Sequence, residues 1–419
     1  GRGITGSATM GISGDVGPLS YSLRPLAFWS ENRSFTSVGP PSPPGDYRDP
    51  LLATTAVDHP YRFGAGNYSR IGPGESWVTM NAGGFAAGIS SASQSWGPSD
   101  VAPLVLGTGA AGTPRAFMEA RAVPIGIGRV TAHWAVGRLE ASPVSELPSG
   151  QRSRLSTAVT ANFEPAAFPC LSFGASRFFH VRWDRGIVRS SVATLPFRGL
   201  FKQGNPTDET FLRDYNQLAS VSARLAPKAT GVEVYSEFYR EDHSNDLRDL
   251  TVEADHSSAY TVGIRRSWRD SANVYTVGVE FANGRISRLD RVRPQGPVYA
   301  HGKTAEGHTY LGQYLGAASM PGGGGMVIEA SRAGQLGSWW AEAAIHRALQ
   351  DEEGGQWNGR LSGWYVVRGG RSVVSKNAVY SLTAGIEPGF GWDRATNFAL
   401  GASVRLLARE QDRARPNPD

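Results

Sequence analysis

Four residues at alternate positions, Glu233, Tyr235, Glu237 and Tyr239, form the clearest constellation of polar side chains in the sequence. A pair of carboxylates cleaves a glycosidic bond when the two stand ~5–10 Å apart across a sugar. Positions i and i+4 of a strand lie ~13 Å apart, so Glu233 and Glu237 do not form such a pair. We instead expect a polar ladder inside a barrel, with Arg224 pairing to carboxylates of the neighbouring strand.

Two histidines are candidate catalytic bases. His133 and His346 lie on the polar faces of strand-like segments, His346 with Glu342 beside it. A hydrolase would need a serine and an orienting partner within reach of such a histidine, and no Gly-x-Ser-x-Gly motif in an apolar setting supports one. The acid-rich loop 241–249 lacks the glycine that a calcium loop requires. We therefore expect no catalytic residue, no metal and no cofactor, with a hydrolase as a rival hypothesis.

Tryptophans in or beside loops are the candidate carbohydrate-binding residues. An aromatic ring stacks on the apolar face of a sugar while neighbouring polar groups bind its hydroxyls. The candidates are Trp96 with the nearby Asp100, Trp183 and Trp357. Packing in the interior is the alternative role for each tryptophan, Trp96 included because a Gly-Pro pair follows it. Five others lie on strand-like segments or at their ends and are expected in membrane-interface belts: Trp29, Trp134, Trp268, Trp339 and Trp392.

The elements that would position these residues alternate apolar and polar side chains. The clearest runs from Arg129 to Glu140, where Trp134 and Val136 point away from the side of His133. The same period of two recurs at Leu171–Phe179, Leu218–Leu225, Val232–Tyr239, Ala259–Trp268, Val274–Phe281, Met326–Ser331, Trp339–Arg347, Leu361–Val367, Ala378–Ile386 and Phe398–Leu406. Such segments, separated by turns or loops, are typical of antiparallel barrel strands.

Composition favours one large barrel over several small domains. The 419 residues include 52 glycines and 42 aromatic residues (11 Trp, 14 Tyr and 17 Phe), and 19% are charged. No run approaches the ~18 apolar residues of a membrane-spanning helix, whereas barrel strands spread apolar residues over every second position. The net charge of +5, with acids and bases interspersed, makes nucleic acid an unexpected partner.

We predict an all-β chain, a closed antiparallel transmembrane β-barrel of ~18 strands with long extracellular loops. The barrel would occupy residues 1–407, and a polar tail would follow at 408–419. Its inner ladder would comprise Arg129, His133, Arg224, Glu233 and Glu237. The long connections are Pro40–Gly72, Gly107–Pro114, Pro143–Arg154, Trp183–Thr210, Glu241–His256, Gly284–Gly307 and Asp351–Gly359.

Several short glycine- and aromatic-containing patches occur in order from Tyr61 to Gly316. They are Pro60–Gly64, Gly74–Ser76, Trp96-Gly97-Pro98, Pro124–Gly126 with Gly137–Ser142, Phe168–Gly174, Glu233–Phe238 with Arg240–His243, and Gly307–Gly316. This series resembles the bacterial capsule-assembly family known as Wzi. The resemblance implies an outer-membrane barrel that holds capsular or other extracellular polysaccharide at the cell surface, as a lectin and not as an enzyme.

The expected partners are therefore a polysaccharide and outer-membrane lipid, with the loops facing the cell exterior. The alternative hypothesis is a porin or solute channel. In that case the inner charges of Glu233, Glu237, Arg224 and Arg129 would set its selectivity.

Overall fold

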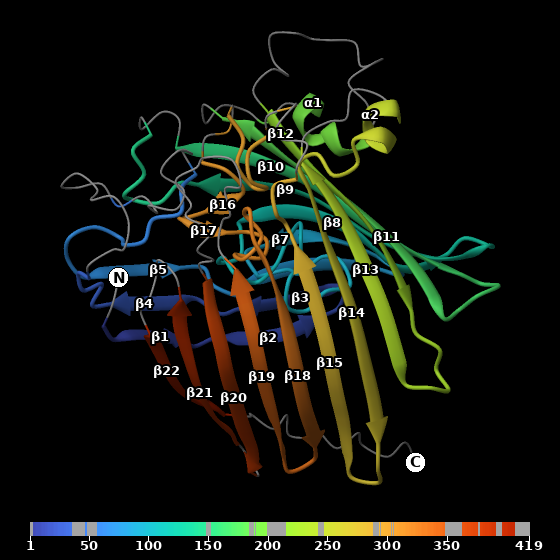
Figure 1. Cartoon of the computed structure of the whole chain (residues 1–419). Coiled ribbons are helices and arrows are strands. Elements are labelled where there is room, and N and C mark those ends of the chain that lie inside the picture. Colours follow the sequence, from blue (N-terminus) through green and yellow to red (C-terminus); the bar gives the residue numbers. More distant parts are fainter. Residues whose placement is uncertain are drawn as a thin grey trace.

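The structure is a computed structural model that describes residues 3–35, 47, 57–147, 152–183, 188, 190–198, 215–241, 247–287, 293, 295–302, 304, 306–347, 363–375, 378–390 and 396–406. Strands are the main regular structure of these residues, and they are arranged as one large curved wall (Figure 1). The predicted tail at 408–419, Trp357 and Trp392 lie outside the described residues.

Within the described residues, 17 strands form one antiparallel sheet in which each strand pairs with the next one along the chain. They are β2 (Ile12–Val16), β3 (Leu19–Leu23), β6 (Trp77–Ala82), β7 (Phe85–Ser90), β8 (Arg115–Pro124), β9 (Gly128–Glu140), β10 (Ser153–Pro165), β11 (Leu171–Arg182), β12 (Tyr215–Leu225), β13 (Val232–Glu241), β14 (Ser258–Arg269), β15 (Asn273–Asn283), β18 (Gly324–Gly334), β19 (Gly337–Arg347), β20 (Gly363–Ser375), β21 (Ala378–Phe390) and β22 (Thr396–Leu406). The predicted all-β class and antiparallel pairing are confirmed, and the count of ~18 stays a prediction.

Smaller elements flank this sheet. A three-stranded sheet of β1 (Thr5–Thr9), β4 (Leu26–Ser30) and β5 (Tyr68–Gly72) extends the lines of β2, β3 and β6 beyond a break. Pro25 and Pro73 stand at this break, where a proline cannot donate to a ladder. The remaining elements are β16 (Thr309–Tyr310), β17 (Gln313–Tyr314), α1 (Ser190–Ala193), the 3-10 turn η3 (Leu195–Phe197) and α2 (Leu247–Val252).

The connections at the two ends of the strands differ in length. At one end, the turn end, consecutive strands are joined by two to six residues, as at 270–272 between β14 and β15. At the other, the loop end, connections include 91–114, 183–214 and 284–323. The helices α1 and α2 lie at this loop end (Figure 1). The other long connections that the sequence indicated also join strands at the loop end, because antiparallel strands alternate the end at which they are joined. Asp351–Gly359 lies outside the described residues.

The outer, convex face of the sheet carries an apolar belt. On β14 the side chain of Ile264 is 52% exposed, whereas Thr261 on the opposite face is fully buried. The pairing carries this face across the sheet, since Ile264 stands opposite Val279 and Val279 opposite Ile328. Other large apolar side chains exposed on it are Val262, Phe281, Met326, Val367, Leu382, Ile386, Phe398, Leu400 and Val404. A water-soluble protein rarely exposes so extended an apolar surface.

Aromatic side chains border this belt near the turn end. The rings of Trp268 and Tyr275, opposite each other on β14 and β15, stack with centroids 5.5 Å apart. Trp339 occupies the corresponding position on β19, opposite Arg332 and Arg371. None of the helices that the structure describes is long and apolar enough to cross a membrane.

Candidate functional site

The space enclosed by the inner face is filled at the loop end by a plug, which we define as residues 91–112, 297–302 and 306–323. Its apolar side chains, such as Leu104, Tyr299 and Met320, are buried in one cluster with inner-face residues of the strands, such as Phe178 and Tyr239. The hydroxyl of Tyr299 donates to the carbonyl of Leu104 at 2.6 Å, which joins residues 297–302 of the plug to residues 91–112. Hydrophobic burial therefore holds the connections inside the wall instead of leaving them in solvent.

The Trp-Gly-Pro stretch seats the plug against β13. Trp96 is 6% exposed, and its ring centroid lies 6.4 Å from that of Phe178. Gly97 has a φ of +85° and lies against the carboxylate of Glu237, where a Cβ would come within 2.3 Å of Oε2. A glycine is thus needed for both the backbone conformation and the close approach.

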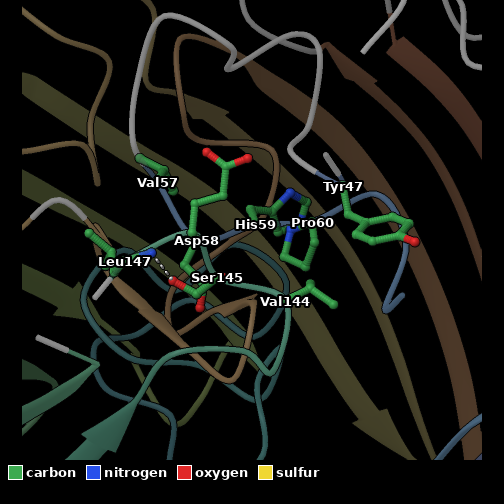
Figure 2. Close-up of a pocket in the computed structure, with 9 residues that line it drawn as sticks. Tyr47, Val57, Asp58, His59, Pro60, Val144, Ser145 and Leu147 are labelled. Carbon is green, nitrogen blue, oxygen red and sulfur yellow. Dashed lines mark hydrogen bonds between the residues drawn. The ribbon is translucent and has the colours of Figure 1, made fainter. Parts of the chain in front are cut away.

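A pocket of about 240 Å³ opens at the loop end beside the plug (Figure 2). It is lined by residues of two connections, among them Tyr47, His59 and Glu146. Asp58 joins the connections, because its carboxylate accepts hydrogen bonds from the backbone N–H and the hydroxyl of Ser142, at 2.5 and 2.6 Å. The pocket therefore offers a phenol, an imidazole and a carboxylate, which are groups that bind sugar hydroxyls.

The imidazole of this pocket is held by the plug. The ring of His59 stacks on that of Tyr314, with centroids 4.5 Å apart and planes 25° from parallel. The Tyr314 side chain itself is buried in the plug cluster. The packing of the plug therefore positions a group that lines the surface pocket.

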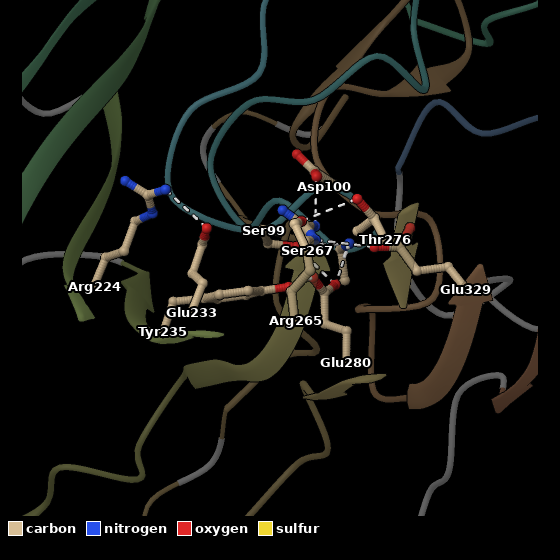
Figure 3. Close-up of polar contacts among 11 residues, drawn as sticks. Ser99, Asp100, Arg224, Glu233, Tyr235, Arg265, Ser267, Thr276, Glu280 and Glu329 are labelled. Atoms are coloured by element: carbon tan, nitrogen blue, oxygen red, sulfur yellow. Dashed lines mark hydrogen bonds and ion pairs between the residues drawn. The ribbon is translucent and has the colours of Figure 1, made fainter. Parts of the chain in front are cut away.

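Below the plug, polar side chains of β13 to β18 bind its underside (Figure 3). The Glu280 carboxylate accepts hydrogen bonds from the Ser99 hydroxyl and the Ala102 N–H, both at 2.7 Å, and from the Tyr235 hydroxyl at 2.6 Å. Asp100 reaches Arg265 at 2.5 Å. The wall thus supplies one acceptor and one cation to the same short stretch of the plug.

A buried row of polar groups binds residues 306–323 of the plug. Arg154, fully buried on β10, donates to the carbonyls of Gly307 at 2.5 Å and Thr309 at 2.7 Å. It also donates to Nδ1 of His180 at 3.2 Å, and Nε2 of His180 lies 2.8 Å from Nδ1 of His308. An arginine only donates, so Nδ1 of His180 accepts and its Nε2–H donates to Nδ1 of His308. A carbonyl only accepts, so Nε2–H of His308 donates to Val105 O at 2.5 Å. Each histidine is therefore neutral, with one ring nitrogen donating and the other accepting.

This arrangement predicts that acid weakens the plug. Burial lowers the pKa of His308 from its usual 6.5 to about 3. The unfolded chain therefore binds a proton below pH 6.5 that the folded protein does not bind until pH 3. Stability present above pH 6.5 is lost as the pH falls through this window, by on the order of 1.4 kcal/mol per pH unit.

The measurement is the free energy of unfolding between pH 7 and pH 4. Replacing His308 by Gln keeps a donor and an acceptor but removes the titration, so the slope should fall by about the contribution of one proton. An unchanged slope in this variant would contradict the assignment.

The structure places the predicted carbohydrate-binding residues in different surroundings. Trp96 and Asp100 belong to the plug, whereas Trp183 lies on the outer side of the sheet. There it packs on a cluster that contains Phe179. Phe178, the preceding residue of the strand, points to the opposite face and packs on the plug. Trp183 is therefore not brought together with Trp96 and Asp100. Trp357 lies outside the described residues.

Trp134 also differs from an exposed belt position, because residues 190–198 cover it on the outer side of the sheet. Its indole N–H donates to the carbonyl of Ala193 at 3.0 Å, and its ring meets that of Phe197. Arg177, on the same face, donates to the carbonyl of Pro196 at 2.9 Å. This segment satisfies polar groups that would otherwise interrupt the apolar belt.

The predicted ladder residues all lie on the inner face. Glu237 contacts the plug, and Arg224 donates to Glu233 at 2.7 Å. His133 lies 3.1 Å from Gln94 and 3.4 Å from Glu119, and Arg129 stands opposite Glu164 near the turn end. The other candidate base, His346, lies against Trp364, with ring centroids 5.3 Å apart. In the part of the chain that the structure describes, no group of three His, Cys, Asp or Glu side chains could hold a metal ion.

Sequence reasoning did not find Tyr47, His59 or Glu146. They come from two connections far apart in the chain, which the hydrogen bonds between Asp58 and Ser142 help to join. No local period or spacing signals such a meeting.

Comparisons with known proteins identify a solved structure with a similar architecture. No protein-family model matches the chain, and no curated protein matches it significantly. Among solved structures, Wzi, an outer-membrane protein involved in group 1 capsule assembly in Escherichia coli and described as a carbohydrate-binding β-barrel, has a TM-score of 0.64 and 13% identity. The match covers 95% of this chain and 77% of that one.

Two further solved structures have lower TM-scores. OccK2 (OpdF) of Pseudomonas aeruginosa, in complex with glucuronate, has a TM-score of 0.47 at 9% identity and covers 96% of this chain and 90% of its own. A BenF-like porin from Pseudomonas fluorescens Pf-5 has a TM-score of 0.46 at 8% identity, covering 96% and 91%. The chain therefore has the fold of the outer-membrane β-barrel Wzi, and the resemblance to the Wzi family that the sequence indicated is confirmed at the level of the fold.

Proposed function

We propose that this protein is an outer-membrane β-barrel that binds and organises capsular or extracellular polysaccharide at the cell surface, without catalysis. The observation that carries the proposal is the plug. Leu104, Leu315 and Met320 are each at most 1% exposed, so the plug fills the loop end of the interior with closely packed side chains. An interior filled in this way favours presenting a binding surface over conducting solutes.

We further propose that the sheet closes, with β22 meeting β2, and that it lies in the lipid of the outer membrane. Open strand edges are not tolerated in hydrocarbon, because their N–H and C=O groups would have no partners. The apolar belt continues onto both end strands, through Ile12 of β2 and Phe398 and Leu400 of β22. By the usual rule for such barrels the short turns face the periplasm and the loop end faces the exterior.

The loop-end pocket is the proposed polysaccharide contact. Tyr47 and His59 present ring faces and Glu146 presents a carboxylate in about 240 Å³, a volume suited to one sugar unit of a longer chain. Trp183 and Trp357, predicted from the sequence, stay candidates for further contacts, whereas Trp96 is buried in the plug and Asp100 lies on its turn side.

The test is polysaccharide binding by the detergent-purified protein. A glycan array or a capsule-binding assay should find a surface polymer that binds, and replacing Tyr47 by Ala or Glu146 by Gln should weaken that binding about tenfold, the effect of ~1.4 kcal/mol. Replacing Tyr260, which is exposed in the outer belt, by Ala serves as the matched loss of a phenol and should change it less than twofold. If no surface polymer binds at any salt concentration, the proposal fails.

The second candidate is a porin or solute channel. The charged inner face on the turn side of the plug favours it, with Arg121 and Glu119 on one wall and Arg265 and Glu329 on another. Planar-bilayer conductance separates the two. We expect little steady current from the unmodified protein, and a large open-channel current would support the channel instead.

A further inference from the structure

A second cavity, of about 480 Å³, lies under the plug on the turn side and takes no part in the proposed surface binding. Asp100 of the plug is among its lining residues, and the others come from strands β13 to β19. Ser267 and Thr276, which also line it, stand within four residues of the turn-end connection 270–272. These lining residues place the cavity on the turn-end side of the plug, and Figure 3 shows Asp100, Ser267 and Thr276 among them.

The lining of this cavity has an excess of negative charge. Among the lining residues that the structure describes, four carry carboxylates, Asp100, Glu233, Glu329 and Glu342, and one, Arg265, carries a positive charge. Arg265 is shared, with its guanidinium 2.5 Å from Asp100 and 3.1 Å from Glu329. Two carboxylates thus compete for one guanidinium, and a ligand that brings a positive charge relieves their repulsion.

The other two carboxylates have arginine partners outside the lining. Glu233 accepts from Arg224 at 2.7 Å, and Glu342 accepts from Arg368 at 2.9 Å. Counted with these partners, four carboxylates face three guanidinium groups, which leaves one net negative charge.

One carboxylate oxygen is left without a partner. The Glu342 side chain is 10% exposed, and Arg368 contacts its Oε2. Its other oxygen, Oε1, accepts no hydrogen bond from any residue that the structure describes. An unpaired acceptor buried in this way costs free energy that a donor on a ligand recovers.

An indole completes the cavity. Trp340 lies next to Glu342 on the inner face of β19 and is part of the lining. It lies across Gly370 of β20, where a Cβ would come within 2.6 Å of the indole Nε1. Indole faces attract ammonium groups, and the hydroxyls of Ser267 and Thr276 can bind hydroxyls of a solute.

From this combination we infer that the turn-side cavity binds a small hydroxylated ammonium ion, of the class of a protonated amino sugar. The ammonium is bound between the carboxylates and Trp340, and the ligand hydroxyls reach the serine and threonine side. The volume falls within the range of small-molecule sites. An anionic sugar is rejected, because it would add to the uncompensated negative charge.

Calorimetric titration of the detergent-purified protein tests this inference with three related monosaccharides as probes. Glucosamine carries the ammonium, N-acetylglucosamine lacks the charge, and glucuronate reverses it. We expect glucosamine to bind at least tenfold more tightly than either of the others. Glu329→Gln and Glu342→Gln should each weaken glucosamine binding about tenfold, since each removes one carboxylate and keeps the side-chain shape.

The matched control is Glu164→Gln, which removes the same charge from the exposed inner side of β10, outside the cavity. It should change glucosamine binding less than twofold. Failure of glucosamine to bind, equal binding of N-acetylglucosamine or glucuronate, or an equal effect of Glu164→Gln would each overturn the inference. Polysaccharide binding at the loop end is measured separately, so either proposal can fail without the other.

Discussion

Replacing Gly97 by Ala is expected to loosen the plug and lower the free energy of unfolding by about 2–4 kcal/mol. Two costs add at this residue. Its φ of +85° disfavours any side chain, and the added Cβ would lie 2.3 Å from Oε2 of Glu237. Glu237 is 1% exposed, so its carboxylate has no free space into which to move. The substitution should therefore push residues 91–112 away from β13.

The measurements are the denaturant midpoint, the protease sensitivity of residues 91–112 and the bilayer conductance, which should rise as the plug loosens. Gly126→Ala is the matched control, because Gly126 has a φ of +82° but nothing within 4 Å of its Cβ position. It should cost only the backbone strain, about 1 kcal/mol, and leave the conductance unchanged. Equal effects of the two substitutions would show that the contact with Glu237 does not position the plug.

Replacing Arg154 by Met should have the largest effect on stability, a loss of about 3–5 kcal/mol. The methionine fills a similar volume but leaves the carbonyls of Gly307 and Thr309 without their donor. It also leaves Glu306, 4% exposed and 3.8 Å from the Arg154 guanidinium, as a buried charge without its counter-ion. Each unpaired group retains its desolvation cost.

Hydrogen exchange of residues 306–323 and the unfolding midpoint together measure this effect. Arg224→Met is the control, because that arginine also binds a carboxylate, at 2.7 Å, but its side chain is 44% exposed. An exposed pair contributes about 0–1 kcal/mol. A loss of less than 1 kcal/mol for Arg154→Met would mean that the plug does not depend on this arginine.

The strands of the large sheet were predictable from the sequence, because apolar and polar residues alternate along each strand according to the face on which they lie. On β14, Val262 and Ile264 are exposed while Thr261 and Gly263 are buried, and the alternation that reveals this is a property of consecutive residues. The same holds for β9, predicted at Arg129–Glu140 and observed at Gly128–Glu140. Local patterning suffices wherever a residue's environment depends on its strand alone.

The plug could not be predicted in this way, because its contacts join residues far apart in the chain. Tyr299 binds the carbonyl of Leu104 across 195 positions, and Arg154 binds that of Thr309 across 155. The apolar run around Leu104 reads like a buried strand, yet it forms an irregular segment in the interior. Glu280, which holds the underside of the plug, has no sequence feature that separates it from other strand carboxylates.

The proposed function requires that the outer face of the sheet contacts lipid and that the inner face does not. Nitroxide scanning of β14 in lipid vesicles, one position at a time from 259 to 268 with Cys170 replaced by Ser, tests this directly. Positions 260, 262 and 264 should be readily relaxed by oxygen, which partitions into hydrocarbon, and positions 261 and 263 should not. If oxygen accessibility shows no two-residue period, or a water-soluble nickel complex reaches positions 262 and 264, then this sheet does not lie in a membrane.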